Sequence, residues 1–380
     1  LDGNYPVGTG NVALGNTALD SNVSGNANTA IGNNTLTANT ASDNTGLGYF
    51  SLENNTTGAS NVSIGRSTMR STTSGSYNTA IGKSALESNT TASNNTAVGY
   101  QALYSNTTGS ENAGLSNAAL QLNTTGNYNA AAGRGALNVN TTGSNNSAFG
   151  YLALSANTTA SNNTAVGYQA GYSNTTGIDN TSLGMNTLRT NTTGTQNTAV
   201  GKNALYTGTG TYNTAVGFNA GSDITTGSKN TILGAYAGNQ GGLDIRTSSN
   251  NIVLADGDGN IRLYIDSNGD VLIGKVSTSS TVSGIHIGTE KITATRDAGP
   301  CAAFVRTGSD GQVVTIQNDG TTVGSISVDG SATAFNTSSD YRLKENVAYD
   351  WDATTRLKQL KPARFNFIST PDTTIDGFIA

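Results

Sequence analysis

A repeat of seventeen residues dominates the chain and restricts its fold more than any other feature. Segments such as 78–82 (NTAIG) and 95–99 (NTAVG) recur on a fixed period. Successive closing residues are 17 apart except for two steps of 16, and they fall at Gly15, Gly32, Gly48, Gly65, Gly82, Gly99, Ser116, Gly133, Gly150, Gly167, Gly184, Gly201, Gly217 and Gly234. Self-similarity at a fixed period is typical of repeat architectures, so we expect fourteen structural units between about residue 11 and residue 238.

The unit 95–111 (NTAVGYQALYSNTTGSE) defines positions 1 to 17 of the repeat. Position 4 is aliphatic or aromatic nearly throughout, and position 9 is usually Leu. Seventeen residues are too few for a pair of helices and suit two short strands with two turns. We therefore predict an all-β, parallel β-solenoid whose coils stack about 4.8 Å apart, so that fourteen coils extend roughly 65 Å. Positions 4 and 9 are expected to be the two buried apolar anchors of each coil, and Asn and Thr are expected to form hydrogen-bonded ladders along the axis.

The size of this apolar core predicts self-association. Burial of the two anchors of each coil stabilises the fold by roughly 1.5–3 kcal/mol per anchor. Ordering the chain costs about 1–2 kcal/mol for every residue, which is more than two anchors offset. A single coil of this size has almost no interior, and rod-like symmetric assemblies are usually cyclic. We expect several chains to share one core, as a homotrimer.

Composition excludes several other classes of protein. The chain has 380 residues, of which 48 are Gly and 11% are charged, against roughly 25% charged in an ordinary globular domain. One Cys and one His leave no internal disulfide and no His/Cys metal cluster, so neither a metal nor a cofactor is expected. No basic stripe indicates a nucleic acid partner, and no apolar run approaches the ~20 residues of a membrane span. The chain starts at Leu1 rather than Met and stops abruptly in GFIA, which suggests a fragment of a longer protein.

The repeat resembles two known families. NTAIG-type units are similar to the head repeats of trimeric autotransporter adhesins, which form trimeric left-handed parallel β-rolls, and still more similar to related repeats of bacteriophage tail fibres. The adhesin heads use a slightly shorter coil. The resemblance implies a trimeric, fibre-forming shaft.

A different pattern follows the repeats. Residues 250–275 alternate with period two and predict three strands joined at Gly259-Asn260 and Asn268-Gly269. Residues 302–330 predict further strands punctuated by Asp-Gly turns. The run from Asp256 to Asn260 is spaced like part of a calcium loop, but Ile261 and Ser267 stand where an EF-hand needs Gly and Glu, so a turn is expected.

Two isolated residues of this region carry little chemistry. His286 has no second His to share a metal, which favours an ordinary strand residue, packed or exposed. Cys301 has no candidate base beside it, and a passive thiol is expected.

The last 42 residues hold 6 of the 19 basic residues and the only Trp, so we expect a separate domain there. Segments 338–347 (SSDYRLKENV) and 357–368 (LKQLKPARFNFI) resemble the start of the intramolecular chaperone auto-processing domain of phage tail spikes, tail fibres and endosialidases. In that α-containing domain family, the domain trimerises the fibre, assists its folding and then cuts itself off. The matching residues are Ser339, Asp340, Arg342 and Lys344, with Gly377 to Ala380 matching a later family segment.

The resemblance implies that Ser339 and Lys344 are a catalytic serine–lysine pair and that the scissile bond joins Ser339 to Asp340. A Lys whose pKa is lowered by burial can remove the proton that otherwise keeps a Ser hydroxyl weakly nucleophilic. Attack by Ser339 on its own carbonyl would close a strained four-membered ring, so a neighbouring chain or an upstream acyl shift is needed. Without the resemblance, the residues favour a polar helix start with Ser339 as its N-cap.

These observations predict three regions: a solenoid shaft over 1–240, a β-hairpin stalk over 241–335 and the truncated start of a chaperone domain over 336–380. The function expected is a phage tail fibre that attaches to a glycan receptor of the host and matures by autoproteolysis; a bacterial trimeric surface adhesin is the alternative. An ice-binding solenoid fits less well, because the adjacent threonines of the NTT segments point to opposite faces of a strand. A glycan-cleaving spike needs paired carboxylates, and residues 1–238 hold only 8 scattered acidic residues.

Overall fold

The computed structural model describes residues 7–288, 292–296, 300–304, 309–318, 320–337, 354, 362–366 and 374–378, the last two segments as backbone only. The chain divides into two compact units, Leu1–Cys301 and Ala302–Ala380. Every element with defined bounds among the described residues is a β-strand, and the expected helical part of the last 45 residues lies outside them.

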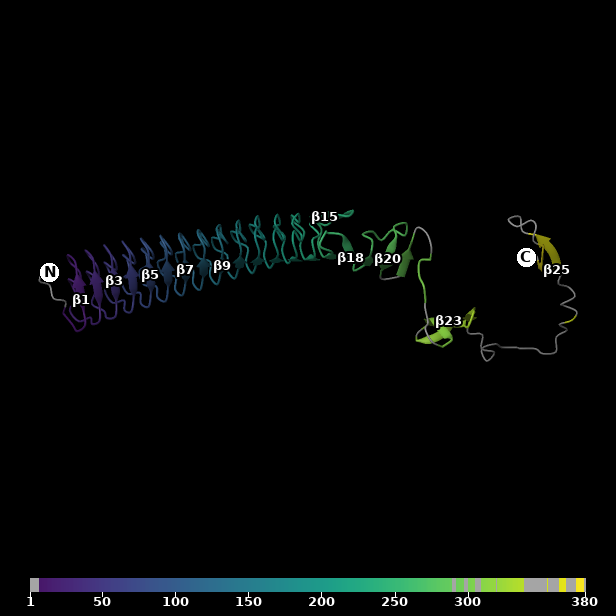
Figure 1. Cartoon of the computed structure of the whole chain (residues 1–380), viewed down its shortest axis with the longest axis horizontal. Coiled ribbons are helices and arrows are strands. Elements are labelled where there is room, and N and C mark those ends of the chain that lie inside the picture. The colour runs from purple at the N-terminus through teal and green to yellow at the C-terminus, as the bar shows by residue number, and fades with distance from the viewer. Residues whose placement is uncertain are drawn as a thin grey trace. The chain divides into compact units, whose positions relative to one another are not determined.

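The first unit is built on a β-solenoid of fourteen coils that stack side by side along one axis (Figure 1). Each coil contributes one three-residue strand to a parallel sheet, and neighbouring strands pair in register, 17 or 16 residues apart. The strands are β1 (Val12–Leu14), β2 (Thr29–Ile31), β3 (Thr45–Leu47), β4 (Val62–Ile64), β5 (Thr79–Ile81), β6 (Thr96–Val98), β7 (Ala113–Leu115), β8 (Ala130–Ala132), β9 (Ser147–Phe149), β10 (Thr164–Val166), β11 (Thr181–Leu183), β12 (Thr198–Val200), β13 (Thr214–Val216) and β14 (Thr231–Leu233). The solenoid predicted from the repeat is therefore present.

The interior of each coil is lined by small residues and one Leu. Because successive strand residues point to opposite faces, a three-residue strand has one inward side chain, which is usually the Ala of position 3. Ala97 is fully buried, and so are Ala102 and Leu103 at positions 8 and 9 of the same coil. The expected anchor at position 9 is confirmed. The expected anchor at position 4 is wrong: Val98 lies on the outer face of its strand and is 37% exposed.

The expectation of two strands per coil is also wrong, because tight turns complete each coil after its single strand. Residues at positions 7, 9 and 17, such as Gln101, Leu103 and Glu111, adopt positive φ angles of 55°, 53° and 60°. Backbone hydrogen bonds still join these turns to the next coil, as from Leu103 N to Ala119 O (3.0 Å). Left-handed residues keep the coil small while the ladder between coils continues.

Position 5 requires glycine for a steric reason. Gly99 has φ of +137°, and a Cβ there would lie 2.5 Å from the carbonyl carbon of Ser116, the residue at the same position of the next coil. Ser116 itself has φ of +138°. The sequence thus places one strained side chain in a column of glycines.

Buried asparagines stack in two ladders inside the solenoid. At position 1, Oδ1 of Asn78 accepts a hydrogen bond from the backbone amide of Asn95 (2.9 Å), and this contact recurs as far as Asn251. At position 12, Nδ2 of Asn123 donates to Oδ1 of Asn106 (2.8 Å) and to Gly126 O (3.0 Å). Position-12 asparagines begin the NTT segments and are buried, so these segments are hydrogen-bonding turns.

The sheet continues past the solenoid with a change of direction. After a short hairpin, β15 (Asn239–Gln240) and β16 (Leu243–Asp244), the strand β17 (Ile252–Ala255) pairs parallel with β14. Antiparallel strands then follow in order: β18 (Ile261–Ile265), β19 (Val271–Ile273), β20 (Gly284–Ile287) and β21 (Ile292–Thr295). The three strands predicted over 250–275 are confirmed.

The second unit contains two small antiparallel sheets. The first joins β22 (Gly311–Asn318), β23 (Thr321–Asp329) and β24 (Ala332–Thr337). The second pairs β25 (Pro362–Asn366) with β26 (Thr374–Phe378).

Candidate functional site

The residues predicted to catalyse self-cleavage lie outside the described residues. Ser339, Asp340, Arg342 and Lys344 all belong to this part of the chain, so their roles stay predictions. Of the later matching segment, Gly377 and Phe378 belong to β26, where Gly377 pairs with Ala363.

The outer face of the long sheet is the most extensive candidate surface of the first unit. Its position-4 column is apolar throughout and is formed by Leu14, Ile31, Leu47, Ile64, Ile81, Val98, Leu115, Ala132, Phe149, Val166, Leu183, Val200, Val216 and Leu233. Nine of these side chains are more than a third exposed, from Val98 at 37% to Leu14 at 54%. The column continues across the antiparallel strands to Ile273 and Ile285, each 40% exposed.

A second column lies beside it on the same face. Position 2 is mostly Thr in the solenoid, as at Thr79 and Thr96, and becomes Ile in the later strands, as at Ile252 and Ile287. Neither column contains a charged residue in the fourteen coils. Sequence reasoning missed that this face points outward, although the alternation within each Thr-Ala-Val triplet already indicates that positions 2 and 4 share a face.

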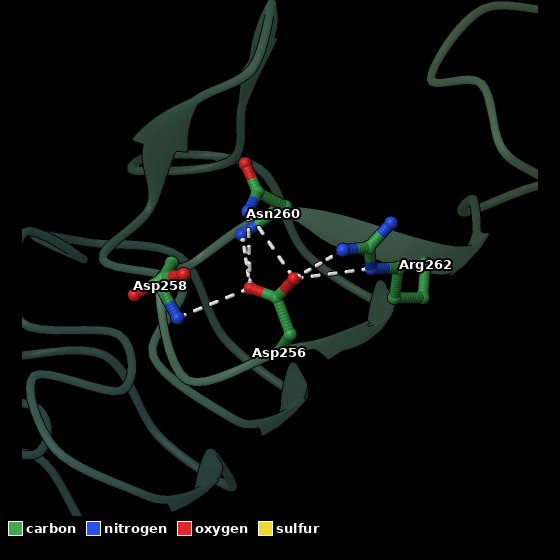
Figure 2. A network of polar contacts seen from close by, with 4 residues as sticks. All are labelled: Asp256, Asp258, Asn260 and Arg262. Atoms are coloured by element: carbon green, nitrogen blue, oxygen red, sulfur yellow. Dashed lines mark hydrogen bonds and ion pairs between the residues drawn. The ribbon is translucent and has the colours of Figure 1, made fainter.

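The turn between β17 and β18 is held by one carboxylate (Figure 2). Oδ1 of Asp256 accepts hydrogen bonds from the backbone amides of Asp258 (3.1 Å) and Asn260 (2.9 Å), and Oδ2 accepts from Arg262 Nε (3.1 Å). Hydrogen bonds from the side chains of Arg262 and Asn260 lower the pKa of Asp256 to about 2. These donors occupy the oxygens that a calcium ion would need, so the predicted turn is confirmed.

The same turn recurs between β18 and β19. Oδ1 of Asp266 accepts from the backbone amides of Asn268 (2.9 Å) and Asp270 (3.0 Å). Over the parts of the chain that the structure describes, no group of three or more His, Cys, Asp or Glu residues is arranged to hold a metal ion.

His286 is packed in the sheet, as one of the two alternatives expected. It is 6% exposed on β20 and pairs across the strands with Leu272. Its Nε2 lies 3.2 Å from Oδ2 of Asp270, which is ion-pair distance, but the two groups are not aligned as a hydrogen bond. Cys301 is an exposed free thiol.

No family model matches this chain, and no curated protein or solved structure matches it either. A search of the described segments for helices finds none long and apolar enough to cross a bilayer.

Proposed function

We propose that this chain is a structural fibre protein of a phage virion, a homotrimer that attaches to a host-cell glycan receptor and matures by self-cleavage in its carboxyl-terminal region. The observation that carries the proposal is the apolar outer column, which runs along all fourteen coils of an in-register solenoid. Soluble monomers rarely expose a continuous apolar surface of this length, so a partner covering it is the simplest explanation.

The chemistry of this face suits a copy of the same chain. The fully buried part of an interface is depleted of charged residues, and neither position 2 nor position 4 carries one in the solenoid. A repeat that presents the same side chains every coil is complementary to another repeat of equal spacing, because both stack at about 4.8 Å. The resemblance to trimeric adhesin heads and tail fibres supplies the number three.

Oligomeric state tests this part of the proposal. Leu115→Glu together with Leu183→Glu adds charges to the outer column without changing the inward residues of either coil. Light scattering should give a trimer mass for the wild-type chain and a monomer mass for this variant, with unchanged circular dichroism. Thr108→Glu with Thr176→Glu, at exposed turn positions, is the matched control and should remain trimeric. A wild-type chain that is folded and monomeric would contradict the proposal.

Self-cleavage is the second part of the proposal. In this reaction the Lys344 amine takes the proton of Ser339 Oγ, the oxygen bonds to a carbonyl carbon, and the peptide C–N bond breaks as the leaving amine is protonated. Water then hydrolyses the resulting ester. Assembly and cleavage are compatible, because in a trimer the attacking Ser339 can belong to a neighbouring chain, which avoids the strained four-membered ring; an upstream acyl shift is the other route.

A bacterial trimeric surface adhesin remains the alternative, since it has the same kind of shaft. The complete reading frame of the gene discriminates between them. A full auto-processing domain supports the fibre, and a membrane anchor at the carboxyl end supports the adhesin.

A further inference from the structure

Position 10 of the repeat holds an arginine in two different settings. In one, Arg70 lies between Glu53 of the previous coil and Glu87 of the next, and its Nε is 2.7 Å from Glu53 Oε2. In the other, Arg189 has tyrosines at the two equivalent positions, Tyr172 and Tyr206. Arg70 also lies over the Phe50 ring (4.4 Å to the centroid), so the two arginines differ in their carboxylates: Arg70 is paired with them, and Arg189 stands between two tyrosines instead.

Arg189 is held in place without a carboxylate. Its Nη1 donates to Tyr206 Oη (2.8 Å), its Nε donates to Gln169 Oε1 (3.0 Å), and its guanidinium carbon is 5.7 Å from the centroid of each flanking ring. None of the ion pairs found among the described residues involves it. These contacts use two of the five N–H donors of a guanidinium, which leaves three for a ligand.

Further exposed aromatic surface belongs to the coil of Gln169 and Tyr172 and to the coil before it. Tyr168, the neighbour of Gln169 in sequence, stacks on Tyr151 of the previous coil with centroids 5.4 Å apart and planes 14° from parallel. Both rings are exposed, at 48% and 40%. Flat aromatic faces and a fixed guanidinium are complementary to the C–H faces and the carboxylate of an acidic sugar.

We propose that Arg189, Gln169, Tyr172 and Tyr206 form a binding site for the carboxylate of an acidic saccharide, with Tyr151 and Tyr168 as a stacking surface beside it. The inference rests on the proposed attachment function and assigns it a place and a ligand chemistry. The carboxylate is that of a uronic acid or of a sialic-type sugar, since both present the same group to an arginine.

Calorimetry on the chain tests the site with defined probes. The acidic probes are tetragalacturonate and 3′-sialyllactose, the neutral counterparts are methyl-esterified tetragalacturonate and lactose, and a tetraglutamate peptide supplies charge without sugar. We expect at least one acidic probe to bind about tenfold or more tightly than its neutral counterpart and than tetraglutamate, the scale of one charge-assisted hydrogen bond. Arg189→Gln should remove that difference.

The repeat provides its own controls. Tyr172→Glu with Tyr206→Glu rebuilds the Glu-Arg-Glu arrangement that already exists around Arg70, and it should abolish binding of the acidic probe while preserving the fold. Arg70→Gln should leave binding unchanged within about twofold. Equal binding of the acidic and neutral probes, of tetraglutamate, or of the Arg189→Gln variant would overturn the site.

The result is separable from the proposed function. Light scattering on the same samples reports assembly independently of any glycan. A trimer that binds only neutral glycans on an array would retain the attachment function and overturn this site, whereas a folded monomer that binds the acidic probe would support this site and contradict the proposed trimer.

Discussion

The backbone amide of Asn112 donates a 2.9 Å hydrogen bond to the side-chain Oδ1 of Asn95, one coil earlier in the stack. The Nδ2 of Asn95 donates in turn to Gly109 O (2.9 Å) within its own coil. The buried side chain of Asn95 thus bonds to a backbone amide of the next coil and to a backbone carbonyl of its own coil. This contact explains why position 1 is Asn: an apolar residue there leaves the Asn112 amide without this partner, whereas Gly109 O still accepts from Asn106 Nδ2 (2.8 Å).

Asn95→Ala should therefore destabilise the solenoid locally, by about 1–3 kcal/mol, because the Asn112 amide loses its partner. Repeat proteins contact only neighbouring coils, so the effect should be concentrated there. Hydrogen exchange should show faster exchange of the Asn112 amide, and denaturant unfolding should report the loss of stability. Thr108→Ala, an exposed change in the same coil, is the control, and equal stability of the two variants would contradict the role of the ladder.

Ser116→Gly should stabilise the chain. Ser116 occupies the position-5 column at φ of +138°, a region that side chains rarely adopt, while glycine fills the other thirteen coils. Relief of this strain is worth about 1–3 kcal/mol, less the entropy that glycine adds to the unfolded chain. Thermal unfolding measures the gain.

The reciprocal change, Gly150→Ala, should destabilise, because a Cβ there would lie 2.4 Å from Gly167 O. A Ser116→Gly variant that unfolds at a lower temperature than the wild type would contradict the assignment of strain.

Periodicity was sufficient to predict the solenoid, its coil number and its inward Leu, since a fixed repeat with one large apolar residue per coil has few other solutions. The inward Leu103 and the hydrogen-bonding role of Asn106 were both predictable from their positions in the unit. The exposure of position 4, which was expected to be the second buried anchor, was not predictable. An apolar column such as that of Val98 and Leu115 marks a surface that avoids water, but its periodicity is the same whether its own chain or another chain covers it.

The candidate sites were predictable to different degrees. The turn at Asp256 follows from spacing alone, because an Asx side chain that caps its own turn needs only local residues. The Tyr172-Arg189-Tyr206 column was missed, since its members are 17 residues apart and lie among variable positions. Only stacking of the coils reveals that they are neighbours. The expected Ser339 and Lys344 pair lies outside the described residues.

The turn at Asp256 should be acid-sensitive. Its pKa is lowered from 3.8 to about 2 in the folded chain, chiefly by hydrogen bonds from Arg262 and Asn260. A lowered pKa stabilises the turn above the unfolded value of about 4, and this contribution is lost as pH falls through about 2. An NMR titration should give a carboxyl pKa near 2 for Asp256, with the Asn260 amide shifting over the same range.

Asp256→Asn should abolish that titration, whereas Asp258→Asn should preserve it, because Asp258 contributes its backbone amide rather than its carboxylate to the turn. An Asp256 carboxyl that titrates near 4 would contradict the network of contacts in Figure 2.

Self-cleavage is testable by expressing the chain together with a complete carboxyl-terminal domain. A gel should show release of a fragment ending at Ser339, because a Lys amine that is kept neutral by burial activates the Ser hydroxyl. Ser339→Ala removes the nucleophile and Lys344→Ala removes the base, so each should abolish release, while Ser338→Ala is the adjacent control and should leave it unchanged. Release should also rise with pH, because only the neutral amine of a lysine accepts the proton. Cleavage that persists in both the Ser339→Ala and Lys344→Ala variants would rule out the pair.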